Sequence, residues 1–112
     1  MKNKTALPIP VVRALRKLGK DVADARKRRR IPVKLMAERA GVSPRTLAKI
    51  EEGDGGVAVS SYVSLIFALG MVERIEDLMD ARQDITGLEL EEEQLPKRIR
   101  LPRNKDKGEA HE

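Results

Sequence analysis

The chain contains no cysteine and a single histidine, His111. The lack of cysteine excludes a disulfide framework. Because activated nucleophiles commonly pair with a histidine and zinc sites are built from cysteine and histidine, we expect neither a catalytic site nor a metal site, and no cofactor. The carboxylates fall at expected helix ends and in loops without a complementary base, which indicates a solvated acidic surface. On these grounds the protein is not expected to be an enzyme.

Aromatic residues are almost as scarce, since Tyr62 and Phe67 are the only two. The core must therefore be built from aliphatic and small side chains, as in a compact helical bundle. No apolar run approaches the roughly 20 residues that cross a bilayer. The first lysines are followed by Pro8 and Pro10 rather than by an apolar stretch, so no signal peptide is expected. These absences predict a cytoplasmic protein that does not associate with membranes.

Charge is plentiful but unevenly distributed along the 112 residues, whose net charge is +5. Residues 11–50 hold thirteen lysines and arginines against three acidic residues, a balance of +10. Residues 51–93 hold two against twelve, a balance of −10, and residues 94–112 hold six against three. This segregation predicts an anion-binding face in the first half of the chain and a different kind of surface in the second.

The chain is organised around residues 32–53, which read PVKLMAERAGVSPRTLAKIEEG. In the first part, Met36, Ala37 and Ala40 have the spacing of one buried helix face. Gly41 follows at the point where that helix must end, because glycine adopts left-handed backbone without a Cβ penalty. A short helix that ends at a tight turn is therefore predicted.

A second short helix follows the turn. Ser43 is a favourable N-cap, and Pro44 suits the first helical position, where its missing N–H costs nothing. Leu47 and Ile50, three residues apart, form the predicted buried side. The outward side presents Pro44, Arg45, Thr46 and Lys49. Two helices joined by a short turn that contains glycine form a helix-turn-helix, whose second helix can enter the major groove of DNA.

Three further helices are predicted from apolar residues at the helical period, at about residues 10–30, 61–69 and 72–80. Gly19 weakens the first by about 1 kcal/mol relative to alanine, which allows a break or kink there. Ser60 or Ser61 is expected to cap the second, and Gly70 to end it. The fold class is therefore all-α, a five-helix bundle over residues 10–82 that follows a flexible segment, residues 1–9.

The helical signal fades over residues 83–112, which are predicted to form an extended or disordered tail. Leu88 and Leu90 alternate with glutamates, and residues 95–105 read LPKRIRLPRNK. Pro96 and Pro102 prevent a helix there, whereas alternation permits an extended arm or an edge strand. Three interpretations remain open, namely a solvated tail, an arm that binds a partner, and a clamp on the DNA backbone.

Residues 35–53, LMAERAGVSPRTLAKIEEG, resemble the Xre-type helix-turn-helix family of phage repressors, Cro proteins and bacterial antitoxins. With its flanking helices, the similarity covers roughly residues 14–80. Val33 departs from the pattern, since many members have a glutamine at this position. Chain length, the long first helix, residues 56–71 and the LPKRIR tail look most like HipB-type antitoxins. That resemblance implies a repressor of its own operon that neutralises a HipA-like kinase.

The resemblance and the charge pattern together predict the DNA contacts. Base contacts are expected from Pro44, Arg45, Thr46 and Lys49, because arginine and lysine suit the acceptors of guanine. Phosphate contacts are expected from Arg28, Arg29, Arg30, Lys34 and Ser43. Because a domain of this size reads few base pairs, we expect a homodimer that binds a pseudo-palindromic operator in double-stranded DNA. The predicted dimer seam consists of Ile75, Leu78 and Met79.

Other functions also fit these residues. A stand-alone Xre-type regulator, or a HigA-like antitoxin that acts mainly by binding its protein partner, would have a similar sequence. A basic first helix resting on an anionic membrane is a third alternative, which we disfavour because a bundle core uses the apolar stripe of that helix.

Overall fold

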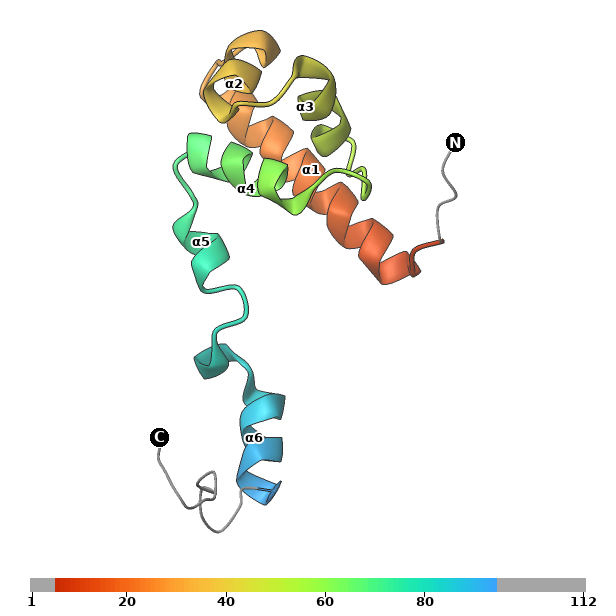
Figure 1. The fold of residues 1–112 in the computed structure, drawn as a ribbon, viewed down its shortest axis with the longest axis vertical. Helices are drawn as coiled ribbons and strands as arrows, with labels where there is room; N and C mark the ends of the chain where they lie inside the picture. The colour runs from red at the N-terminus through yellow and green to blue at the C-terminus, as the bar shows by residue number, and fades with distance from the viewer. Residues whose placement is uncertain (1–5, 95–112) are drawn as a thin grey trace, which may run out of the picture. The chain divides into compact units, whose positions relative to one another are not determined.

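Residues 6–94 are described by a computed structural model, and all of their regular structure is helical (Figure 1). The all-α prediction is therefore confirmed for this part of the chain. The elements are α1 (Ile9–Arg28), α2 (Val33–Ala40), α3 (Pro44–Glu51), α4 (Val59–Ala68), α5 (Glu73–Glu76), the 3-10 helix η1 (Ala81–Gln83) and α6 (Ile85–Gln94). The chain divides into two compact units, Met1–Asp77 and Leu78–Glu112, which are described separately.

The core of the first unit lies where α1 to α4 meet. Helix α3 packs against α1 and α2, and α2 also packs against α4. Met36, Leu47, Ile50 and Leu65 are the largest fully buried side chains, so the predicted buried faces are confirmed. The rest of the core is aliphatic or small apart from one tyrosine: Val22, Ala25, Ala37, Ala40, Tyr62 and Leu69.

Four helices end in the same hydrogen-bonded turn, in which one residue adopts left-handed backbone. Gly41, Gly53 and Gly70 take this position after α2, α3 and α4, with φ of 72°, 81° and 82°. After α1 the position is taken by Arg30, with φ of 55°. Its N–H donates to the Lys27 carbonyl at 2.9 Å, and the Ile31 N–H donates to the Arg26 carbonyl at 3.2 Å. The predicted ends at Gly41 and Gly70 are confirmed.

Gly19 does not break α1, although its low helix propensity allows a break there. The helix is continuous over its 20 residues. A Cβ added at Gly19 would lie 2.5 Å from the Ile50 carbonyl oxygen and 2.7 Å from that of Glu51. The glycine is therefore explained by the close approach of the α3 backbone to α1. The packing of the two helices stabilises the fold, although glycine lowers the local helix propensity of α1.

Helices α4 and α5 differ from the prediction at their ends. Helix α4 begins at Val59, and its N-cap is Ala58 without a side-chain hydrogen bond, rather than Ser60 or Ser61. The loop before it is held by the Tyr62 hydroxyl, which donates to the Asp54 carbonyl at 2.7 Å. Helix α5 is a single turn that ends at Glu76, not at residue 80.

The described part of the second unit contains η1 and α6, which contact each other. Residues 85–94 form helix α6, whereas an extended or disordered tail was predicted there. Its first turn is capped by Asp84, whose side chain accepts from the Gly87 N–H at 3.0 Å and whose carbonyl accepts from the Leu88 N–H at 2.9 Å. This cap, followed by glutamates that favour helix, outweighs the alternation of Leu88 and Leu90. Residues 95–112, with their open interpretations, lie outside the described residues.

Candidate nucleic-acid interface

The start of α3 is formed by a complete local cap. The Ser43 hydroxyl accepts a hydrogen bond from the Thr46 N–H at 3.0 Å and donates to the Thr46 Oγ1, also at 3.0 Å. Pro44 occupies the first helical position, as predicted. The cap therefore engages the hydroxyl groups of both Ser43 and Thr46. Thr46 is only half-exposed.

The cap leaves little free backbone for an anion at this helix start. Pro44 has no N–H, the Thr46 N–H is bonded to Ser43, and the Leu47 N–H donates to the Ser43 carbonyl at 2.9 Å. The Arg45 N–H is the one first-turn donor for which we find no acceptor within residues 6–94. A phosphate here would consequently meet one backbone N–H, not the several that a helix N-terminus can offer.

The outward side of α3 carries two long cations in solvent. Arg45 and Lys49 are exposed and lie four residues, about one helical turn, apart. Leu47 and Ile50 on the opposite side have no exposed surface. Within the described residues, neither cation forms an ion pair. Their donors are therefore available to an external acceptor.

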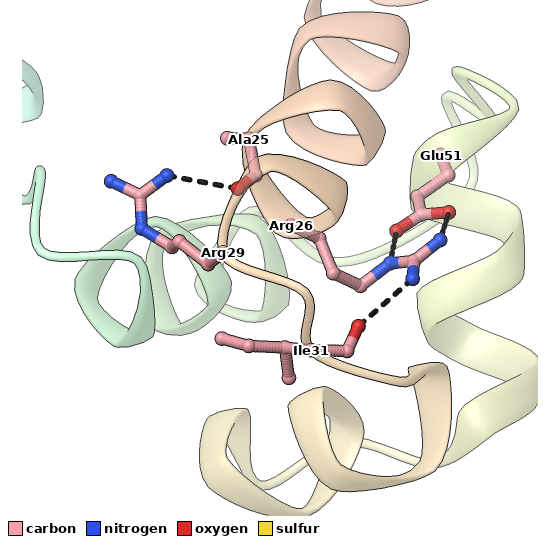
Figure 2. A network of polar contacts seen from close by, with 5 residues as sticks. All are labelled: Ala25, Arg26, Arg29, Ile31 and Glu51. Atoms are coloured by element: carbon pink, nitrogen blue, oxygen red, sulfur yellow. Dashed lines mark hydrogen bonds and ion pairs between the residues drawn. The ribbon is translucent and has the colours of Figure 1, made fainter.

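A second group of cations surrounds the turn between α1 and α2. Arg28, Arg29 and Arg30 are exposed there, and Lys34 is exposed in the first turn of α2. Arg29 donates from Nη1 to the Ala25 carbonyl at 2.9 Å, which satisfies part of its own helix end (Figure 2). No carboxylate in the described chain pairs with any of the four. The predicted phosphate-contact residues are thus exposed cations, apart from Ser43.

Arg26 belongs to the same basic run in the sequence but has a different role. It donates from Nε to Glu51 Oε2 at 2.7 Å and from Nη2 to Oε1 at 3.1 Å (Figure 2). Its Nη1 donates to the Ile31 carbonyl at 3.0 Å. The side chains of Arg26 and Glu51 are only 10% and 14% exposed. The hydrogen bonds to Glu51 raise the pKa of Arg26 above its ordinary value, against the opposing effect of burial.

This ion pair was not identified from the sequence. The available signal was its position on the apolar stripe of α1, four residues after Val22 and one after Ala25. A charged residue in such a stripe requires a partner when the helix is buried. The pair fixes the C-terminal end of α3 against α1.

The predicted dimer-seam residues do not share one helix face. Ile75 is half-buried on α5, whereas Leu78 and Met79 follow the end of that helix. Leu78 is 67% exposed and Met79 is 86% exposed. Only Ile75 of the three residues therefore lies on a helix, because α5 is a single turn that ends at Glu76.

Among residues 6–94, no three histidine, cysteine or acidic side chains gather in a way that could hold a metal ion. No helix in this part of the chain has the length and apolarity needed to cross a bilayer. Comparison with known proteins gives no match to a family model, to a curated protein or to a solved structure. The chemistry of the exposed side chains is therefore the basis for assigning a function.

Proposed function

We propose that this protein is a sequence-specific DNA-binding transcriptional repressor that acts as a dimer, with α3 as the helix that enters the major groove. One observation carries the proposal: Arg45 and Lys49 extend unpaired from the outward side of a helix whose other side is fully buried. The turn that precedes α3 is short and includes left-handed Gly41, as in helix-turn-helix motifs. Base-edge contact from such a helix is the common geometry of these motifs.

The side chains divide into base-reading and phosphate-binding groups. Arg45 suits a bidentate contact with guanine O6 and N7, and Lys49 can reach the same acceptors. Pro44 and the methyl group of Thr46 are suited to apolar contact with thymine. Phosphates are assigned to Arg28, Arg29, Arg30 and Lys34, with the Arg45 N–H in place of the capped Ser43 hydroxyl.

The narrower proposal is an Xre-family antitoxin of the HipB type, which represses its own operon and neutralises a HipA-like kinase. It is supported by the resemblance of residues 35–53 and by the order of helices around them. A stand-alone regulator of the same family has the same DNA-binding surface. The two differ in whether a protein partner is encoded nearby.

The second unit supports a protein-binding role as the alternative. Helix α6 has no buried residue, and it exposes Ile85, Leu88 and Leu90 next to four glutamates. Exposed apolar side chains among carboxylates suit a basic protein surface, and the negative charge disfavours DNA. If this role dominates, α6 rather than α3 carries the main affinity, as in a HigA-like antitoxin.

The test begins with selection of double-stranded DNA from a random-sequence library by the full-length protein. Enrichment of an inverted repeat, which competitor DNA of scrambled sequence does not displace, is the expected result. Recovery of no sequence preference at moderate salt would overturn the proposal. The protein is then co-expressed with the products of its own operon, and co-purification of a kinase-like partner distinguishes an antitoxin from a stand-alone repressor.

A further inference from the structure

Helix α4 has no charged residue on either of its sides. Tyr62, Leu65 and Ile66 face the core. The other side presents three apolar residues and two serines with the spacing i, i+1, i+4, i+5 and i+8, here named the α4 outer stripe: Val59, Ser60, Val63, Ser64 and Phe67. Val63 and Ser64 are half-buried, and the other three are exposed. Val59 is 75% exposed and Phe67, one of only two aromatic residues in the chain, is 66% exposed. A helix that is apolar all round is usually covered on both sides.

The segment of sequence that contains the stripe is free of charged residues. Residues 55–72 contain no lysine, arginine, aspartate or glutamate, although 37% of the whole chain is charged. In a two-fold contact each residue meets the same patch of the other copy, so any charge near the axis faces a like charge. An uncharged surface avoids this repulsion. Contact through the charged parts of the surface would instead bring like charges of the two copies together.

The other exposed apolar side chains are less suited to a second copy. Ile9 and Val11 on α1 are close in sequence to Arg13 and Arg16, which are exposed. Leu88 and Leu90 on α6 alternate with glutamates. A two-fold contact through either surface would bring several like charges together, which costs free energy. Of these three surfaces, only the α4 outer stripe combines exposed apolar side chains with a segment that has no charged residue.

We propose that the α4 outer stripe is the surface through which two copies of this chain associate, in place of Leu78 and Met79. This inference rests on the proposed function, because a repressor that occupies two half-sites needs two copies. The stripe has five residues, whereas a standard interface has roughly 20–30 residues on each side. The dimer is therefore expected to dissociate at micromolar concentrations and to be stabilised when both copies bind adjacent half-sites.

The experiment measures the molar mass of the full-length protein by sedimentation equilibrium from low micromolar to several hundred micromolar concentrations. Wild type is compared with Phe67→Glu, Ser60→Glu and the control Met79→Glu. Ser60 is exposed near the start of α4, where an acidic residue favours the helix, so this variant introduces the charge without removing an apolar side chain. Circular dichroism establishes that each variant folds.

Wild type and Met79→Glu are expected to dimerise alike, whereas both stripe variants should weaken dimerisation by about tenfold or more. A monomer throughout, or dimerisation that Met79→Glu abolishes and the stripe variants leave intact, would overturn the inference. DNA binding is measured on a single half-site in parallel. If wild type does not dimerise but still binds a half-site, the inference about the stripe is wrong and the proposed DNA binding stands. If wild type forms a dimer that the stripe variants weaken but does not bind DNA, the proposed function is wrong and the stripe remains a protein interface.

Discussion

Arg26 and Glu51 join the C-terminal ends of α1 and α3 through two parallel hydrogen bonds, of 2.7 and 3.1 Å. The third bond of Arg26, to the Ile31 carbonyl, extends the link to the turn before α2. One side chain thus connects the three helical segments around the proposed interface. Because Arg45 lies at the other end of α3, the anchor and the residue proposed to contact DNA are separated along the helix.

Replacement of Arg26 by alanine is expected to lower the free energy of unfolding by about 3 kcal/mol, because Glu51 would remain buried without its partner. Urea denaturation followed by circular dichroism measures the change. Arg28→Ala, which removes an exposed arginine from the same helix end, is the control and should alter stability by less than about 0.5 kcal/mol. Equal effects of the two substitutions would show that the ion pair does not stabilise the fold.

Gly19→Ala distinguishes packing from helix propensity by the sign of its effect. Propensity alone would stabilise α1 by about 1 kcal/mol. The added Cβ would instead collide with the Ile50 and Glu51 carbonyls, and we expect a net destabilisation of about 1–3 kcal/mol. The thermal midpoint of unfolding measures the outcome. A variant more stable than wild type would contradict the close approach of α1 and α3.

Arg45→Ala and Arg28→Ala should weaken DNA binding in different ways. Loss of Arg45 is expected to cost about 1–3 kcal/mol and to relax preference at one base pair. Loss of Arg28 should weaken binding to all DNA sequences alike. It should also reduce the slope of log binding constant against log salt concentration by about one. Fluorescence anisotropy with the selected DNA and single-base variants, at several salt concentrations, separates the two. Unchanged sequence preference in Arg45→Ala would exclude it from base recognition.

Arg30→Gly should affect stability and DNA binding in opposite directions. The left-handed backbone of Arg30 suits glycine, so relief of strain is expected to stabilise the fold by about 0.5–1 kcal/mol. Removal of the charge should at the same time weaken DNA binding independently of sequence. Denaturation and anisotropy on the same sample test both effects. A more stable variant that binds DNA as wild type does would remove Arg30 from the phosphate contacts.

Tyr62 should make the fold sensitive to alkaline pH. Burial, with a smaller effect of the Asp54 charge, raises the pKa of Tyr62 above its ordinary value of 10.0. Because the folded state holds the phenol proton more tightly, its contribution is complete below pH 10 and is lost as the pH rises through the folded-state pKa. Ultraviolet absorbance reports this one residue, since the chain has a single tyrosine and no tryptophan.

Tyr62→Phe is the matched variant for this effect. It should cost about 1 kcal/mol at neutral pH, through the lost hydrogen bond to the Asp54 carbonyl, and should reduce the alkaline loss of stability. Denaturation at pH 7 and above pH 10 measures both quantities. An identical alkaline loss in the variant would show that other groups are responsible.

Local signals predicted much of the first unit. The buried faces of α2 and α3 follow from apolar spacing, and the Ser43 cap and the Gly41 turn follow from residue preferences at helix ends. The features that were missed depend on contacts distant in sequence. Gly19 is required because the α3 backbone approaches α1 closely at this position. Arg26 can be buried because it pairs with Glu51, 25 residues later in the sequence.

The errors in the second half of the chain have a different physical origin. Helix α6 lacks an apolar stripe, so the helical period did not identify it, and its start depends on the Asp84 cap. Helix α5 ends at Glu76, and the Asp80 side chain, which accepts from the Arg82 N–H, begins a separate 3-10 turn where the helix was predicted to end.

The anchoring of α3 at its far end has a consequence for how this protein can diversify. Ile50, Glu51 and Gly53 fix the helix against α1, whereas Arg45 and Lys49 contribute nothing to that attachment. Under the proposed function, binding specificity can therefore change by substitution of outward residues without a compensating change in the core. The domain is accordingly suited to retargeting, in evolution or in the laboratory, by randomising those exposed positions while the anchor is kept constant.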